Sequence, residues 1–203
     1  MNLRESIRRI LNEDTGMRNV IRQIVRDIIT VFKNNKRGYF HLPEYFEERE
    51  IMTYEIPKIN SEVVIELMIE EDTSIQGYGV NANFLNEEES IEVKIVYNPS
   101  DKQKILYNLS GELNEIMAHE LRHLFQQVKG THDLDVKPSK DSFKYYTSPH
   151  EIDAQYYGFK RLSKLTKKPF DEVVRNWFET HRDTHELTKG EEDKVINLIL
   201  KHK

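Results

Sequence analysis

The stretch SGELNEIMAHELRHLFQQV, residues 110–128, contains the pattern His119-Glu120-x-x-His123. Apolar residues recur along it at intervals of three and four, which is the period of an α-helix with one buried face. The members of this apolar stripe are Leu113, Met117, Leu121, Leu124 and Val128. The two histidines and Glu120 lie on the neighbouring polar arc, so the core face of the predicted helix is filled without them.

The spacing of the two histidines predicts a metal site. Residues four apart project from the same face of a helix, and two imidazoles on adjacent turns can share one zinc ion at roughly 2.0–2.1 Å each. Glu120 lies about 100° around the helix from His119, beside the metal rather than on it. This is the position of a general base that acts on a water molecule. We therefore expect His119 and His123 as zinc ligands and Glu120 as a catalytic residue.

Composition restricts the class of protein. The chain has 203 residues, enough for one domain with a sizeable core, and its formal net charge is −5. A net negative charge gives no electrostatic reason to expect nucleic acid as a partner. The chain has no Cys, which excludes disulfide bonds and thiolate ligands. No signal peptide is seen, and no run approaches the ~20 apolar residues of a membrane span, so we expect a cytoplasmic protein with no membrane contact.

The region before the motif predicts two helices and a small sheet. The periodicity favours a short helix over Leu3–Glu13, an interruption at Asp14–Gly16 and a longer amphipathic helix over Met17–Phe32. Asn34–Pro43 is typical of a turn region.

Alternating apolar residues then predict strands, which are Glu62–Glu70, Gln76–Phe84 and Ser90–Tyr97, with Ile51–Ile56 as a further strand. Their short polar connections favour an antiparallel meander. We expect Ile91–Tyr97 to be an edge strand that could pair with an extended peptide.

After the motif the sequence indicates helices only. A polar loop is predicted over Lys129–Asp141, followed by helices at Pro149–Leu165, Asp171–Thr180 and Glu191–Leu200. The expected fold is therefore α+β, in one domain. An N-terminal lobe of helices and a small antiparallel or mixed sheet covers residues 1–109, and a helical lobe with the metal site covers residues 110–203.

A catalytic zinc site needs a third protein ligand, and Glu151 is the best choice. If Pro149 begins a helix, Glu151 shares one face with Ala154 and Gly158, whose small side chains allow a close approach to the histidine helix. Asp153 lies about 200° away from Glu151 on the same helix, so both carboxylates cannot face the metal.

A second interpretation of Glu151 is structural. Ser148-x-x-Glu151 with Pro149 at the first helical position also matches a capping box, in which Glu151 would cap its own helix.

The two helices together resemble the zincin metallopeptidases, and among them the gluzincins. The resemblance rests on His119, Glu120 and His123 and on the segment Glu151–Ala154, and covers about Ile91–Leu165. It implies a zincin-like fold and a zinc-dependent peptidase that hydrolyses peptide or protein substrates, with a glutamate as third ligand. Small phage and bacterial metallopeptidases look similar. Gln155 replaces an Asp that is common in the family, and its amide oxygen could accept a hydrogen bond from a ligand histidine instead.

Two other zincin patterns were compared with the chain. The metzincin pattern requires Gly and His where Gln126 and Lys129 stand, so it fails. The aspzincin pattern G-T-x-D is matched by residues 130–133, although the Tyr-Gly pair expected after it is absent. His132 or Asp133 is therefore the second choice for the third ligand.

In such enzymes a Tyr or His stabilises the transition state. The choices here are Tyr145, Tyr146, His150, Tyr156 and Tyr157, and we expect Tyr146. The alternative function is a zinc-stabilised structural or binding protein without turnover, which would not need Glu120. The sequence does not indicate an oligomeric state.

Overall fold

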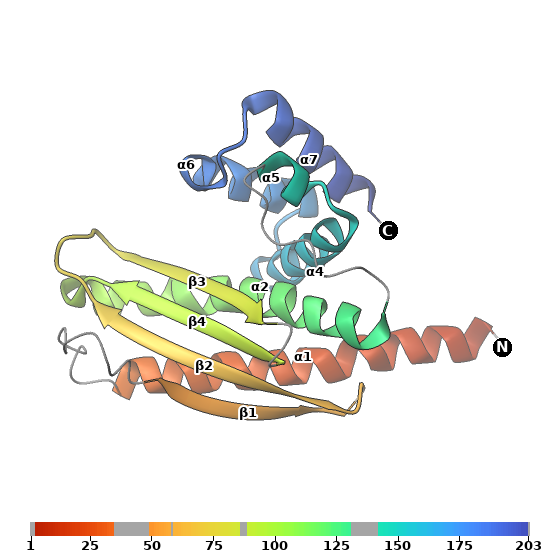
Figure 1. The fold of residues 1–203 in the computed structure, drawn as a ribbon, viewed down its shortest axis with the longest axis horizontal. Helices are drawn as coiled ribbons and strands as arrows, with labels where there is room; N and C mark the ends of the chain where they lie inside the picture. Colours follow the sequence, from red (N-terminus) through yellow and green to blue (C-terminus); the bar gives the residue numbers. More distant parts are fainter. Residues whose placement is uncertain (1–2, 35–48, 58, 86–88, 131–141, 203) are drawn as a thin grey trace. The chain divides into compact units, whose positions relative to one another are not determined.

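The computed structural model describes residues 3–34, 49–57, 59–85, 89–130 and 142–202 (Figure 1). It consists of a long N-terminal helix, a four-stranded mixed sheet and a helical C-terminal region, which confirms the predicted α+β class. The chain forms two compact units, Met1–Leu113 and Asn114–Lys203. Helix α2 (Lys102–Lys129) contributes its first part to one unit and its second part to the other.

Helix α1 (Leu3–Asn34) is continuous, so the predicted interruption at Asp14–Gly16 is wrong. One glycine inside a helix costs about 1 kcal/mol relative to alanine, which is a small penalty in so long an element. The apolar stripe that follows is strongly buried, with Ile24, Ile28 and Phe32 all at 0% exposure. Burial of this face outweighs the local preference for a break. Most of the predicted turn Asn34–Pro43 lies outside the described residues.

The sheet has the strand order β1-β2-β4-β3 (Figure 1). Its strands are β1 (Glu50–Ile56), β2 (Ser61–Glu71), β3 (Tyr78–Leu85) and β4 (Ser90–Tyr97), close to the predicted bounds. β4 pairs in parallel with β2 and antiparallel with β3, so the predicted antiparallel meander is wrong. β4 is also an inner strand, so the prediction that Ile91–Tyr97 forms an edge strand is wrong.

Burial explains why β4 is central and β3 is at the edge. The inward residues of β4 are fully buried, whereas Gly79, Asn81 and Asn83 of β3 are exposed. Glycine and asparagine are poor strand formers that a central position disfavours. The strand with the most apolar sequence therefore occupies the middle of the sheet.

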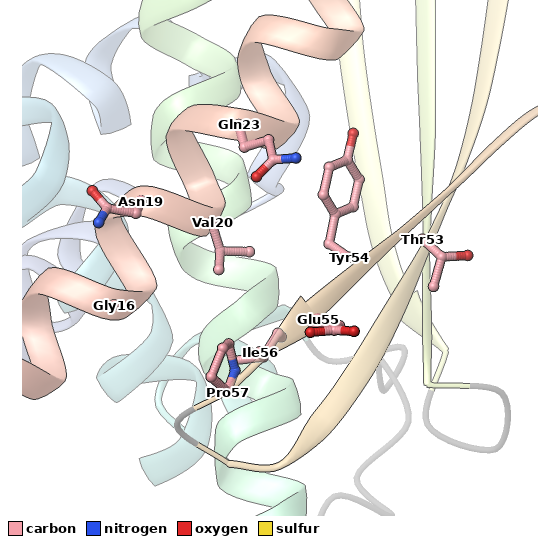
Figure 2. A pocket seen from close by; sticks show the side chains of 9 residues that line it. All are labelled: Gly16, Asn19, Val20, Gln23, Thr53, Tyr54, Glu55, Ile56 and Pro57. Atoms are coloured by element: carbon pink, nitrogen blue, oxygen red, sulfur yellow. The ribbon is translucent and has the colours of Figure 1, made fainter.

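A cavity of about 690 Å³ lies between α1 and β1 in the first unit (Figure 2). The amides of Asn19 and Gln23 line it from the helix, and Thr53, Tyr54 and Glu55 line it from the strand. Glu55 is the single carboxylate among its lining residues. The cavity contains none of the residues that the sequence analysis selects for metal binding.

The predicted helices of the second unit are confirmed. They are α4 (Pro149–Thr166), α5 (Phe170–Thr180) and α7 (Lys189–Lys201). The short helices α3 (Ser142–Tyr146) and α6 (Arg182–His185) and the turn of 3-10 helix at Pro99–Asp101 were not predicted. α2 begins at Lys102 rather than near Ser110. Of the predicted loop Lys129–Asp141, residues 131–141 lie outside the described part.

Helix α4 is held by the apolar core of the second unit. Ile152 and Phe159 project from α4 into a cluster with residues of α5 and α7, including Phe178 and Ile196. α7 begins with a capping box formed by Thr188 and Glu191. No helix in the described ranges is long and apolar enough to cross a membrane.

Candidate metal centre

Helices α2 and α4 bring His119, His123 and Glu151 together within the second unit. Each residue offers one ligand atom, and these three atoms lie within 4.8 Å of one another. The side chain of Glu151 is 3% exposed, so the carboxylate is almost completely removed from water. The three residues selected from the sequence as metal ligands therefore form one buried cluster.

The distances within this cluster fit one shared metal ion. The Nε2 atoms of His119 and His123 are 3.1 Å apart. Glu151 Oε1 lies 3.3 Å from His119 Nε2, and Glu151 Oε2 lies 3.4 Å from His123 Nε2. Two ligands bound tetrahedrally at roughly 2.0–2.1 Å stand about 3.3–3.4 Å apart. The three separations are close to this spacing, with the two histidines facing different oxygens of the Glu151 carboxylate.

The hydrogen bonding of Glu151 also fits a cation. Its Oε2 atom is buried and has no hydrogen-bond partner among the described residues. His123 Nε2 is 3.4 Å away, so this buried oxygen has lost its hydration and gains an electrostatic contact but no hydrogen bond in return. A metal ion held by Oε2 and the two imidazoles would supply the missing interaction. Two histidines and a glutamate are also a ligand set that zinc accepts.

Small residues on α4 create the close approach that builds the site. A Cβ atom added to Gly158 would lie 2.9 Å from Glu115 Oε1, 3.1 Å from the Glu115 carbonyl oxygen and 3.5 Å from His119 Cβ. A side chain there would displace the Glu115 carboxylate and crowd the Glu115 carbonyl oxygen. Ala154, one turn earlier, is fully buried. The expected contact between this face of α4 and the histidine helix is confirmed.

The alternative role of Glu151 as a helix cap is wrong. Ser148 is the N-cap residue of α4, but its side chain makes no capping hydrogen bond. The Ser148 hydroxyl instead donates to the carbonyl oxygen of Tyr145 at 2.7 Å. Glu151 is therefore directed to the histidines and not to its own helix end.

The protonation states of the cluster follow from burial and charge. Burial lowers the pKa of His119 to about 4. Burial alone would raise the pKa of Glu151, but the neighbouring histidines outweigh it and hold this pKa at about 2. Burial also opposes charge on His123, yet the adjacent Glu151 carboxylate raises the pKa of His123 above its ordinary value. Glu151 is therefore ionised at neutral pH, as a metal ligand must be.

Glu120 is buried and acts electrostatically on residues of the cluster. Glu120 is 8% exposed. The charge of its carboxylate contributes to the raised pKa values of His123 and Tyr145. The carboxylate is thus close enough to both residues to act electrostatically on them. This arrangement leaves Glu120 next to the three ligand atoms and not among them.

The two neighbouring tyrosines have different surroundings. Burial, followed by the charge of Glu151 and a hydrogen bond to it, raises the pKa of the Tyr145 phenol. The ring of Tyr146 packs against Phe178 and His185. Burial and the charge of Glu151 raise the pKa of Tyr146 to about 12. Both phenols keep their proton at neutral pH, but the hydrogen bond to a ligand belongs to Tyr145.

Four further residues that the sequence analysis considered around the metal have these outcomes. Asp153 faces away from the cluster and pairs with Arg122, at 2.6 Å between Oδ2 and Nε. Gln155 donates to Glu151 Oε1 at 3.1 Å, and its own buried amide oxygen has no hydrogen-bond partner among the described residues. The expected hydrogen bond from a histidine to this oxygen is therefore wrong. His132 and Asp133 lie outside the described residues.

Sequence reasoning missed Gln126, whose side chain contacts His123. Its position three residues after His123 places it on the same side of the helix, which was the available signal.

Comparison of the chain with protein families, curated proteins and solved structures gives no significant match. The function is therefore inferred from the chemistry of the cluster alone.

Replacement of the third ligand is expected to remove most of the metal affinity. Glu151→Ala leaves two ligands where about three are needed, so zinc binding should weaken by more than the roughly 10–100-fold lost with an outer hydrogen-bond partner. Isothermal titration with zinc measures this change. Glu191→Ala, which removes the capping glutamate of α7, is the matched control and should leave zinc affinity unchanged. Normal zinc binding by Glu151→Ala would exclude Glu151 as a ligand.

Zinc affinity is also expected to depend on pH. Zinc competes with the proton on His123, whose pKa is raised by the Glu151 carboxylate, whereas His119 with a pKa of about 4 stays neutral. Affinity should therefore fall by about tenfold per pH unit once the pH drops below the pKa of His123. Competition titrations with a zinc chelator between about pH 8 and pH 5 test this dependence. A constant affinity over that range would contradict a site with two histidine ligands.

Proposed function

We propose that the protein is a zinc-dependent peptidase. The observation that carries the proposal is the buried cluster of His119, His123 and Glu151, whose ligand atoms are close enough to share one ion, with Glu120 next to His119 in the same helix. Catalytic zinc sites use three protein ligands and keep one position open. Structural sites are closed by four protein ligands, and among the described residues only three converge on this point.

Glu120 is the proposed general base. When bound, zinc supplies a Lewis acid that polarises a carbonyl group and lowers the pKa of water. Glu120 accepts a proton from the attacking water and delivers it to the leaving amine. Its burial beside His123 removes competing solvent from this transfer. A purely structural zinc site does not need a general base next to its ligands.

Tyr145 is the proposed donor to the developing negative charge. Tyr146, expected from the sequence, remains a second possibility for this role. Tyr145 is preferred because its hydroxyl hydrogen bonds to the ligand Glu151, whereas the ring of Tyr146 packs against Phe178. A phenol whose pKa is raised remains protonated at neutral pH and can donate a hydrogen bond throughout the reaction.

The proposed partner is a peptide or protein substrate, and the net charge of −5 continues to argue against nucleic acid. The rival function is a zinc-stabilised binding protein without turnover. Both functions predict bound zinc. Only the peptidase predicts cleavage of a broad peptide library that a metal chelator abolishes.

Loss of the general base should abolish turnover without loss of metal. Glu120→Gln keeps the shape of the side chain but cannot accept the proton, so hydrolysis should fall by about 10²–10⁴-fold. Peptide-library cleavage and bound zinc are measured on the same samples. Glu172→Gln on α5, whose side chain is half exposed, makes the same chemical change as a control and should keep full activity. Undiminished cleavage by Glu120→Gln would remove Glu120 from the mechanism.

The two tyrosines provide a matched pair for the donor role. Tyr145→Phe should lower kcat by about 10–10³-fold, measured with zinc saturating, because the phenol no longer stabilises the charge that develops in the transition state. Loss of the hydrogen bond to Glu151 should also weaken zinc binding. Tyr146→Phe removes the same hydroxyl from the neighbouring residue and should leave kcat nearly unchanged. A loss confined to Tyr146→Phe would transfer the role to Tyr146.

A further inference from the structure

Gln126 is the most deeply buried polar residue next to the metal cluster. It has 0% exposure, and its side-chain amide contacts three groups. Oε1 lies 3.1 Å from His123 Nδ1, and Nε2 donates to the carbonyl oxygen of His150 at 2.9 Å and to Asp153 Oδ2 at 2.7 Å. A fully buried amide with these partners has both of its N–H groups and its oxygen engaged.

The chemistry of the partners fixes the orientation of this amide. The carbonyl oxygen of His150 and the carboxylate of Asp153 can only accept hydrogen bonds, so the NH₂ group of Gln126 must face them. The amide oxygen is then forced toward His123 Nδ1. Because that oxygen can only accept, Nδ1 must carry the proton when the ring of His123 is neutral. The lone pair of His123 is thereby left on Nε2, the atom that points to His119 and Glu151.

Asp153 anchors the amide from the far side. Its carboxylate accepts hydrogen bonds from Arg122 Nε at 2.6 Å and Arg122 Nη2 at 3.1 Å. His202 Nε2 lies 3.1 Å from Oδ1, at the end of α7. The Arg122 guanidinium is itself held over the rings of Phe125 and Tyr157, at 4.8 and 4.1 Å from their centroids. Several rigid contacts therefore fix the carboxylate that orients Gln126.

We infer that Gln126, anchored by Asp153, is a positioning residue that holds His123 in the Nδ1–H tautomer with Nε2 free to bind the metal. The inference rests on the proposed metal centre but not on peptidase activity. Hydrogen bonds to the outer nitrogen of a ligand histidine fix its ring and raise its basicity, and their loss typically costs 10–100-fold in metal affinity. Here an amide on the histidine helix itself provides that hydrogen bond, and a carboxylate on α4 secures the amide.

The first test uses the metal-free protein. The ¹⁵N chemical shifts of the His123 ring are recorded as the pH is raised until they no longer change, which is the range in which the ring is neutral. The wild type should carry its proton on Nδ1. Gln126→Met, which keeps the length of the side chain and removes the acceptor, should shift the proton toward Nε2 and Glu151. A wild-type ring protonated mainly on Nε2 would overturn the inference without any reference to zinc.

The second test measures zinc affinity of the folded variants. Gln126→Met should bind zinc about 10–100-fold more weakly than the wild type, and Asp153→Asn should weaken binding in the same direction by a smaller factor. Gln103→Met makes the same change at an exposed position near the start of α2 and should keep wild-type affinity. Equal affinity of Gln126→Met and the wild type would contradict the positioning role. If Gln126→Met does not fold, the tautomer of His123 in the wild-type protein decides whether the positioning role is accepted or rejected.

The outcomes separate this inference from the function on which it rests. Weakened zinc binding by Gln126→Met in a protein that cleaves no peptide supports the positioning role and rejects the peptidase. If the wild type binds no zinc, the proposed metal centre is wrong. The tautomer of His123 in the metal-free protein still shows whether Gln126 orients that ring.

Discussion

The contact between the Glu151 carboxylate and the Nε2 atoms of His119 and His123 is the interaction on which the site depends. A carboxylate on α4 that has left water needs compensation, and two imidazoles alone leave one of its oxygens without a hydrogen bond. A shared cation satisfies all three groups at the observed separations. The metal is thus expected to stabilise the fold of the second unit as well as to serve chemistry.

The surrounding sequence is consistent with this requirement. Gly158 gives α4 the space to approach α2 at His119, and the core formed with α5 and α7 holds α4 in that position. Gln126 and Asp153 orient one ligand from outside the cluster.

Local sequence patterns were enough to predict the helices, the strands and the candidate ligands. They could not predict which strands pair with each other. The i, i+4 spacing of His119 and His123 and the small face at Gly158 are readable because both depend on single helices. The strand order was missed because alternation predicts strands but not their neighbours, and the parallel pairing of β4 with β2 joins segments separated by β3. Gln126 and Tyr145 were missed or ranked low because their roles depend on contacts with α4.

X-ray absorption spectroscopy of the zinc-loaded protein tests the central claim most directly. The account predicts a zinc ion with two imidazole nitrogens and oxygen ligands at roughly 2.0–2.1 Å, and the loss of one imidazole contribution in either His119→Ala or His123→Ala. A zinc environment with fewer than two imidazoles in the wild type, or one unchanged by both substitutions, would contradict it.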